Sequence, residues 1–164
     1  MSYFFNFEKM EYVQGRRPSG CILCLVRDKS PEVVDLSVWA DADFTVTVNL
    51  YPYNPGHLMI FPNRHIQDVR ELSNTEETRL TTLTRTTLDI LDEIYHPSAY
   101  NIGYNMGPSA GASIDHLHLH VIPRYPREIG IADLVAGSRV LVEDPRVTRQ
   151  RVADAFARHT PDTA

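Results

Sequence analysis

Three histidines at alternating positions are the residues of this chain whose types and spacing best suit chemistry. They stand in residues 116–122, His-Leu-His-Leu-His-Val-Ile. Side chains alternate between the two faces of a β-strand, so this pattern places His116, His118 and His120 on one face and apolar residues on the other. Neighbouring histidines are then about 6.5–7 Å apart between α-carbons, from a rise of roughly 3.3 Å per residue. At that spacing the imidazoles can act on one ligand.

Three interpretations of this row are open. The histidines are separately hydrogen-bonded residues of a half-exposed sheet, or ligands of a metal, or a catalytic group that uses a neutral imidazole as nucleophile at phosphorus. A strict row of three seldom arises by chance, and the loop before it is short of carboxylates and suits anions better than cations. The pattern therefore favours nucleophilic catalysis.

The loop before the row has the composition of a phosphate-binding turn. Residues 107–113, Gly-Pro-Ser-Ala-Gly-Ala-Ser, are almost all small, so a ligand can approach the backbone closely. Successive N–H groups in such a turn can form an anion-binding nest, to which Gly111 would contribute. Asn105 and Ser113 flank the loop as neutral donors, which can hold phosphoryl oxygens or a leaving group without repelling the nucleophile.

The sequence patterns of the helices and strands that must position these residues predict an α+β fold. Strands are expected at residues 57–61 and 100–105, each bounded by turn residues. Ser73 and Glu76 form a capping box, and apolar residues then recur at three- and four-residue spacing to about residue 95. A shorter helix is expected at about 148–158. We predict an antiparallel sheet whose apolar face is covered by the helix at 73–95.

A further strand is expected at residues 44–50, where apolar and polar residues alternate. Its predicted core side consists of Phe44, Val46, Val48 and Leu50. Asn49 is therefore expected to face away from the core.

Composition and charge limit the kinds of protein this chain can be. Its 164 residues are 43% hydrophobic and 23% charged, as in an ordinary single globular domain. The net charge of −5 argues against a surface for nucleic acid polymers. No apolar run reaches membrane-spanning length and the first residues lack a signal-peptide pattern, so we expect no membrane association and a cytoplasmic protein. We expect an arm over residues 1–20, a catalytic domain over 21–127, and an extension over 128–164 packed on that domain.

The histidine row resembles the signature of the histidine triad (HIT) superfamily, His-φ-His-φ-His-φ-φ with φ apolar, at every position. Asn49, followed by Pro-Gly-His57 eight residues on, is similar to the fragile-histidine-triad branch, as is Asn105 eleven residues before His116. The resemblance extends over residues 21–124. Residues 49–58 and the loop look most like bacterial diadenosine tetraphosphate hydrolases and phosphorylases, whereas residues 125–130 lack the Trp-x-Gly-Asp-x-Asn-Phe pattern of many of them.

The resemblance implies a reaction and roles for single residues. His118 would attack the α-phosphorus of a dinucleoside polyphosphate, with diadenosine tetraphosphate as the best candidate, and form a covalent nucleotidyl intermediate. Water or inorganic phosphate would then accept the nucleotidyl group. His120 would contact phosphate, His57 would line the same site, and Asn49 would hold the ribose. The resemblance also implies a homodimer with joined sheets.

Two other functions remain open from the sequence. One is hydrolysis of adenosine phosphoramidate or aminoacyl adenylates, the reaction of the other large HIT branch. The other is a purine-nucleotide binding module with little turnover.

Cys21 and Cys24 have the C-x-x-C spacing of a metal or redox pair. His65 and His116 would complete a tetrahedral Cys₂His₂ zinc site, similar to the structural zinc of some superfamily members. The alternative is that both cysteines are small core residues. A zinc ion here would be structural and would anchor the N-terminal segment to the histidine row.

Overall fold

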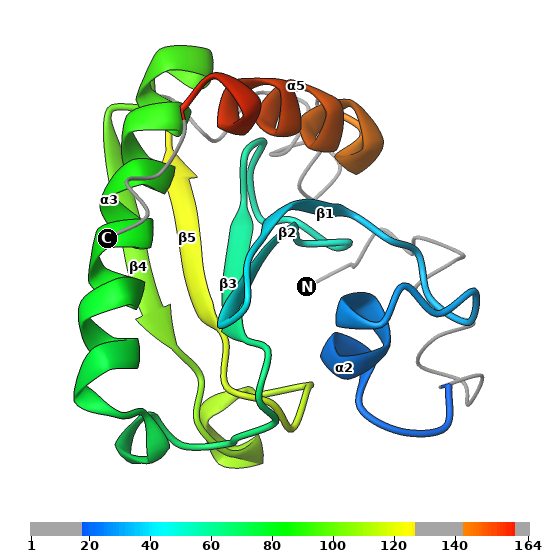
Figure 1. Cartoon of the computed structure of the whole chain (residues 1–164). Helices are drawn as coiled ribbons and strands as arrows, with labels where there is room; N and C mark the ends of the chain where they lie inside the picture. The colour runs from blue at the N-terminus through cyan, green and yellow to red at the C-terminus, as the bar shows by residue number, and fades with distance from the viewer. Residues whose placement is uncertain (1–17, 127–142, 160–164) are drawn as a thin grey trace.

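The computed structural model describes residues 18–126 and 143–159, and these residues form the α+β architecture predicted from the sequence (Figure 1). Residues 1–17 of the predicted N-terminal arm and much of the predicted C-terminal extension lie outside the described residues. In chain order the elements are α2 (Ile22–Arg27), β1 (Ser37–Ala40), β2 (Phe44–Val48), β3 (Leu58–Pro62), η1 (Val69–Glu71), α3 (Asn74–Tyr95), β4 (Ala99–Tyr104), η2 (Pro108–Ala110), β5 (Leu119–Arg124) and α5 (Pro145–Arg158).

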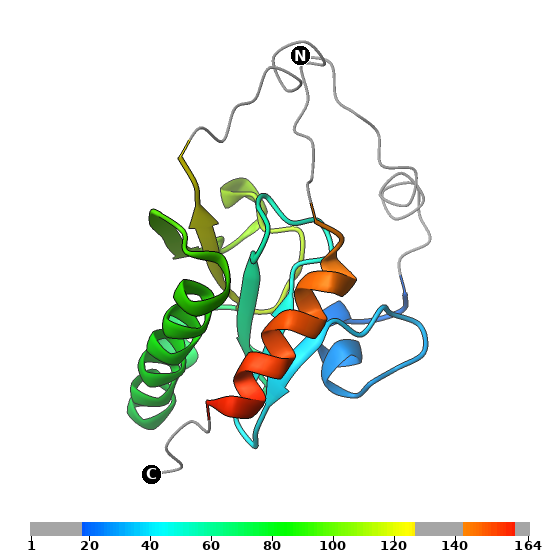
Figure 2. The same cartoon turned by 90° about the horizontal axis from the view of Figure 1, so that it is seen from above.

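The five strands form one antiparallel sheet in the order β1-β2-β3-β5-β4. On one face, α3 and α5 pack over the strands, and Figures 1 and 2 show the two helices beside each other there. The main core forms between these helices and alternate strand residues such as Ile60, Leu119 and Val121. Ser73 caps α3 through the predicted capping box, so the expected start of this helix is confirmed.

The opposite face of the sheet carries the histidines, and among the described residues α2 covers part of it. Leu23 and Val26 of α2 pack there against Met59 and Phe61 of β3 in a second, smaller core. All five residues of β2 are buried, including the threonines that face this side. The space left beside α2 holds the candidate site.

Two predicted strands differ from the observed ones at an end. The strand expected at 44–50 ends at Val48, and Leu50 is exposed because the chain has already turned away from β3. The strand expected to begin at His116 begins at Leu119 instead. The residues just before Leu119 do not pair with β3, and the Leu117 N–H donates instead to the Ile66 carbonyl at 2.6 Å. The alternation nevertheless persists, since Leu117 joins the main core.

The last helix begins three residues earlier than expected. Asp144 caps α5 by accepting a hydrogen bond from the Arg146 N–H, and Pro145 occupies the first helical position, where its missing N–H costs nothing. The helix buries Val152, Ala155 and Phe156 in the main core.

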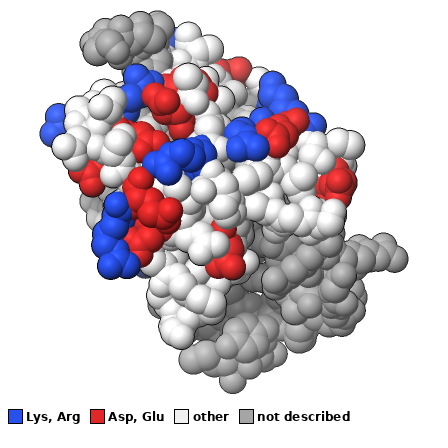
Figure 3. All heavy atoms as spheres, turned by 60° about the horizontal axis from the view of Figure 1, so that its bottom comes forward, with Lys and Arg blue, Asp and Glu red and all other residues white. Residues whose placement is uncertain are grey.

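The charged surface consists largely of opposite charges placed close together. Figure 3 shows basic and acidic side chains interspersed on one face of the molecule. Ion pairs join Arg64 to Glu76 at 2.9 Å and Arg70 to Asp68 at 2.6 Å. Within the described residues, no helix has both the length and the apolar character needed to cross a bilayer.

Candidate active site

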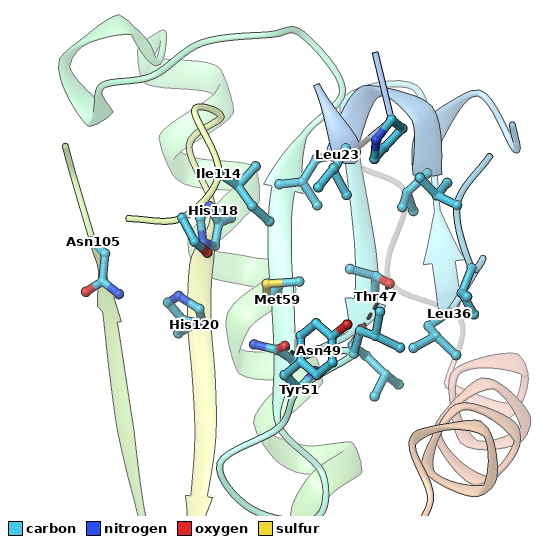
Figure 4. Close-up of a pocket in the computed structure, with 18 of the residues that line it drawn as sticks. Leu23, Leu36, Thr47, Asn49, Tyr51, Met59, Asn105, Ile114, His118 and His120 are labelled. Carbon is cyan, nitrogen blue, oxygen red and sulfur yellow. Dashed lines mark hydrogen bonds between the residues drawn. The ribbon is translucent and has the colours of Figure 1, made fainter. Parts of the chain in front are cut away.

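A cavity of about 610 Å³ runs across the histidine-bearing face of the sheet. Figure 4 shows His118 and His120 at one end and Leu36 at the other, with Met59 and Thr47 between them. Six of the residues predicted to act on a nucleotide line this cavity, namely Asn49, Asn105, Gly111, Ser113, His118 and His120. The lining is polar at His118 and His120 and becomes mainly apolar from Met59 toward Leu36 (Figure 4).

His118 is held with one ring nitrogen free. Its Nδ1 lies 2.7 Å from the carbonyl oxygen of His116, and because a carbonyl only accepts, Nδ1 must carry the proton. The lone pair is then on Nε2. Burial lowers the pKa of His118 below its usual value, against an opposing effect of this hydrogen bond, so the ring is neutral near pH 7. A neutral imidazole with a free ring nitrogen is chemically able to act as a nucleophile.

Backbone groups also fix the tautomers of His57 and His120. The Tyr53 N–H donates to His57 Nδ1 at 3.1 Å, so His57 carries its proton on Nε2. That Nε2 lies 3.0 Å from His120 Nδ1, which must accept. His120 therefore has Nε2–H as a donor. This assignment makes the 3.4 Å approach of Asn49 Nδ2 to His57 Nε2 a contact between two donors.

His57 supports the site from behind. It is fully buried, is not among the residues that line the cavity, and stacks against the Tyr53 ring at 5.4 Å. The structure places His57 behind His120, which it contacts, and outside the lining of the cavity. Burial, followed by repulsion from His120 and His118, lowers the pKa of His57 to about 3. Burial and His118 lower the pKa of His120 to about 4.

The turn before His57 sets its position. Gly56 has a φ of +80°, and a Cβ there would lie 3.2 Å from Leu91, Tyr95 and Pro123 side chains. Only glycine fits such a turn without a shift of its neighbours. The backbone thus packs directly onto α3 and presents His57 to His120.

The small-residue loop differs in detail from the predicted nest. The N–H groups of Ala110 and Gly111 donate within the loop, to Gly107 and Pro108 carbonyls at 3.0 Å, and the Ala112 N–H also donates to Gly107. These amides are occupied by the short η2 turn and do not point freely at a ligand. Gly111 lines the cavity with a φ of +87°, so its contribution is shape. Ser113 and Asn105 supply polar side chains nearby.

The apolar end of the cavity includes residues that sequence reasoning did not find. Ile22, Leu23 and Val26 of α2 line it, together with Met59 and Leu36. Their apolar character was visible in the sequence, but their meeting depends on how α2 docks. Arg146 also lines the cavity, although it comes from α5, far along the chain. No motif marks that residue.

The two cysteines and two histidines predicted as metal ligands are brought together. One ligand atom from each of Cys21, Cys24, His65 and His116 lies within 4.8 Å of all the others. Cys21 Sγ is 3.3 Å from His116 Nδ1, and Cys24 Sγ is 3.4 Å from His65 Nδ1. His116 thus turns Nδ1 toward the cysteines, and among the described residues the three histidines of the row do not form a metal-binding cluster with one another.

Three sulfur–nitrogen distances in the cluster fit a tetrahedral metal. Zinc bound by sulfur at about 2.3 Å and nitrogen at about 2.05 Å places neighbouring ligand atoms about 3.3–3.8 Å apart. The third sulfur–nitrogen contact, between Cys24 and His116, is 3.6 Å. His116 Nε2 lies 2.8 Å from the Pro62 carbonyl oxygen and must donate to it, which leaves the Nδ1 lone pair facing the thiols. Burial and the Cys21 thiol raise the pKa of Cys24 to about 11.

Comparison with known proteins places this architecture in a family. A model of the HIT domain family matches residues 30–127, so the chain belongs to the HIT family, as the histidine row predicted.

Among individual proteins, the chain is 38% identical over 112 residues to an AP-4-A phosphorylase of Mycobacterium tuberculosis, covering 68% of this chain and 57% of that protein. It is 36% identical over 88 residues to a bis(5'-nucleosyl)-tetraphosphatase (asymmetrical) of Schizosaccharomyces pombe, covering 54% and 48%. The chain thus spans about half the length of these relatives. A zinc-bound histidine triad protein of Mycobacterium smegmatis has the same fold, with a TM-score of 0.67 and 20% identity over 85% of this chain and 95% of that one.

Proposed function

We propose that this protein cleaves dinucleoside polyphosphates, with diadenosine tetraphosphate as the preferred substrate, through a nucleotidyl group carried on His118. The observation that carries the proposal is the hydrogen bond from His118 Nδ1 to the His116 carbonyl, which leaves Nε2 as a neutral nucleophile facing the cavity. The names of the two relatives above support this substrate class.

The two ends of the cavity suggest how a nucleotide binds. A phosphate must lie at His118 for attack, so the nucleobase extends toward the apolar end formed by α2 and Met59. The ribose then lies near Asn49. The volume of about 610 Å³ falls within the range of small-molecule sites, roughly 300–1,000 Å³.

In the first step, His118 Nε2 forms a bond to the α-phosphorus while the bond from phosphorus to the bridging oxygen breaks, which releases ATP. The His120 Nε2–H donates to the departing oxygen, and His57 holds His120 in the required tautomer. Ser113 and Asn105 hold phosphoryl oxygens. His57 is thus a positioning residue, and His118 and His120 are the catalytic ones.

In the second step, an acceptor attacks the nucleotidyl group and restores His118. Inorganic phosphate gives ADP, and water gives AMP. We propose phosphate, because the M. tuberculosis relative is named as a phosphorylase.

The proposed chemistry is tested by the products and by trapping the intermediate. With diadenosine tetraphosphate and millimolar phosphate, we expect ADP and ATP. AMP and ATP in proportions insensitive to phosphate would contradict phosphorolysis and leave hydrolysis. Acid-labile label on the protein after a quench with α-labelled substrate would support the covalent step, and binding without any turnover would instead indicate a nucleotide-binding module.

We also propose that Cys21, Cys24, His65 and His116 hold a structural zinc ion, supported by the fit of their distances to tetrahedral coordination. The ion would cross-link α2 to the loop after β3 and to the histidine row. Elemental analysis should give about one zinc per chain after growth in zinc-replete medium. Well under half an equivalent would contradict this proposal.

A homodimer with joined sheets is proposed from the edge of the sheet. β4 is the last strand in the order, and its Ile102 is 46% exposed. An unprotected edge strand with an apolar side chain pairs readily with another strand. Sedimentation equilibrium should give twice the chain mass for the wild type, and Ile102→Lys should shift it toward the single chain.

A further inference from the structure

Helix α2 belongs to both the cysteine cluster and the nucleotide cavity. Cys21 stands at its N-cap and Cys24 lies within its first turn, while Ile22, Leu23 and Val26 of the same helix line the apolar end of the cavity. The helix has only six residues, and Cys21 makes no side-chain capping hydrogen bond. A helix this short is unstable by itself, so its position depends on the contacts that hold it.

Within the described residues, Leu23 and Val26 pack on Met59 and Phe61, and the end of the helix is held by a hydrogen bond from Arg27 to the Asn63 carbonyl. At the start of the helix, the polar side-chain contacts are those of the cysteine thiols with the imidazoles. A thiol is a weak hydrogen-bond partner, whereas a metal would replace these contacts with four coordinate bonds. The metal would therefore be the main anchor of the N-terminal end of α2.

The phosphate end of the cavity has its own supports. The His116 ring is held by the Pro62 carbonyl at 2.8 Å, and His118 by the His116 carbonyl. His120 is held by His57 and by its place in β5, opposite Met59 of β3. These supports are hydrogen bonds within the sheet and its flanks, and none of them runs through a cysteine thiol.

We propose that Cys21 and Cys24 are positioning residues for the nucleobase. The metal they hold fixes α2 against the sheet and completes the apolar wall, so metal binding and nucleobase binding are thermodynamically coupled. This inference rests on the proposed function, because it is the phosphate at His118 that directs the base toward α2. The coupling is selective: it strengthens binding of the base and leaves binding of the sugar phosphate largely unchanged.

The test compares two ligands that differ only by the base, AMP and ribose 5-phosphate. Their dissociation constants are measured by calorimetry, with competition where affinity is low, on the full chain loaded with zinc and after chelation. We expect chelation to weaken AMP binding about tenfold, within the usual range of coupling between sites. Binding of ribose 5-phosphate should weaken by less than about twofold. Re-addition of zinc should restore both values. By reciprocity, AMP should tighten zinc binding against a chelating dye by the same factor, and ribose 5-phosphate should not.

Two variants separate positioning from general stability. Cys24→Ser should reproduce the selective loss of AMP affinity. Val152→Ala, in the main core on the opposite face of the sheet, should lower stability without changing the ratio of the two dissociation constants. If Cys24→Ser does not fold, the two ligands are compared on the zinc-loaded and chelated wild-type protein alone.

Equal weakening of the two ligands on chelation, or no change in either, would overturn the inference and leave the proposed function intact. A zinc-loaded protein that does not bind AMP would contradict the proposed function as well.

Discussion

The first two histidines of the row, His116 and His118, use the same side chain in opposite ways. At the cysteine cluster, His116 donates through Nε2 to the Pro62 carbonyl and turns Nδ1 toward two thiols. At the cavity, His118 donates through Nδ1 to the His116 carbonyl and turns Nε2 toward the ligand space. Both rings are buried and neutral, and they differ in which nitrogen meets a carbonyl. The ring nitrogen that donates to a backbone carbonyl thus determines which nitrogen keeps its lone pair. That lone pair faces the thiols in His116 and the ligand space in His118.

The largest expected effect comes from removing the nucleophile. His118→Ala should lose on the order of 10⁴-fold or more in turnover, about 5.5 kcal/mol, because the covalent path is gone. Nucleotide binding should stay within about tenfold, since base, ribose and phosphate contacts remain. Single-turnover kinetics and calorimetry measure the two quantities. A variant that keeps more than a tenth of the rate would disprove covalent catalysis at this residue.

Loss of a ligand from the cysteine cluster at His116 should lower the stability of the protein. Cys21→Ala removes a ligand of the proposed zinc site, and we expect the free energy of unfolding to fall by about 3 kcal/mol, or roughly 6–12 °C in melting temperature. Turnover at saturating substrate should fall much less than in His118→Ala. Zinc content and thermal unfolding are measured together. A melting temperature within 2 °C of the wild type would show that the cluster does not stabilise the fold.

Acid should weaken the fold partly through His57. Its pKa falls from 6.5 in the unfolded chain to about 3 in the fold, so the unfolded chain binds the extra proton as pH drops below 6.5. The stability present above pH 6.5 is therefore lost as pH falls toward 3, with about 2 kcal/mol lost between pH 7 and 5.

In His57→Asn, the part of the acid-induced loss of stability that comes from His57 should be absent. Urea unfolding at pH 7 and at pH 5 measures this difference. An unchanged pH dependence in this variant would mean that His57 is not the group responsible.

The smallest effect is expected at the edge of the cavity. Arg146→Ala should raise KM about threefold with kcat unchanged, because an exposed guanidinium contributes modestly and equally to bound substrate and transition state. Arg85→Ala, an exposed arginine of α3 that does not line the cavity, is the matched control and should leave both constants unchanged. A lower kcat in Arg146→Ala would place this residue closer to the chemistry.

Much of the fold followed from local patterns. The capping box at Ser73 gave the start of α3, and the alternation of residues 116–122 gave the side on which each residue lies. The start of β5 did not follow, because it depends on where the chain leaves β3 to bond with Ile66, a contact 51 residues away in sequence. Local periodicity carries no information about such a departure.

The candidate site likewise has parts that local sequence patterns predict and parts that depend on long-range contacts. The four metal-binding candidates were predicted from residue type and spacing, and the structure brings them together. The hydrogen bond between His57 and His120 joins residues 63 apart, so the burial of His57 behind the cavity was not visible in the sequence. Arg146 comes from a helix whose docking is set by apolar residues such as Phe156, and those residues say nothing about where an arginine will point.

The carbonyl of His116 has a consequence for the lifetime of the proposed intermediate. Once Nε2 is bonded to phosphorus, Nδ1 keeps its proton and its hydrogen bond, so the ring becomes a cation. The cationic ring leaves phosphorus as neutral imidazole, which is a better leaving group than the imidazolate that a ring without the Nδ1 proton would become. The surrounding burial disfavours the positive charge. The carbonyl offsets part of that cost and keeps the ring aligned. The proposed nucleotidyl-histidine should therefore be short-lived.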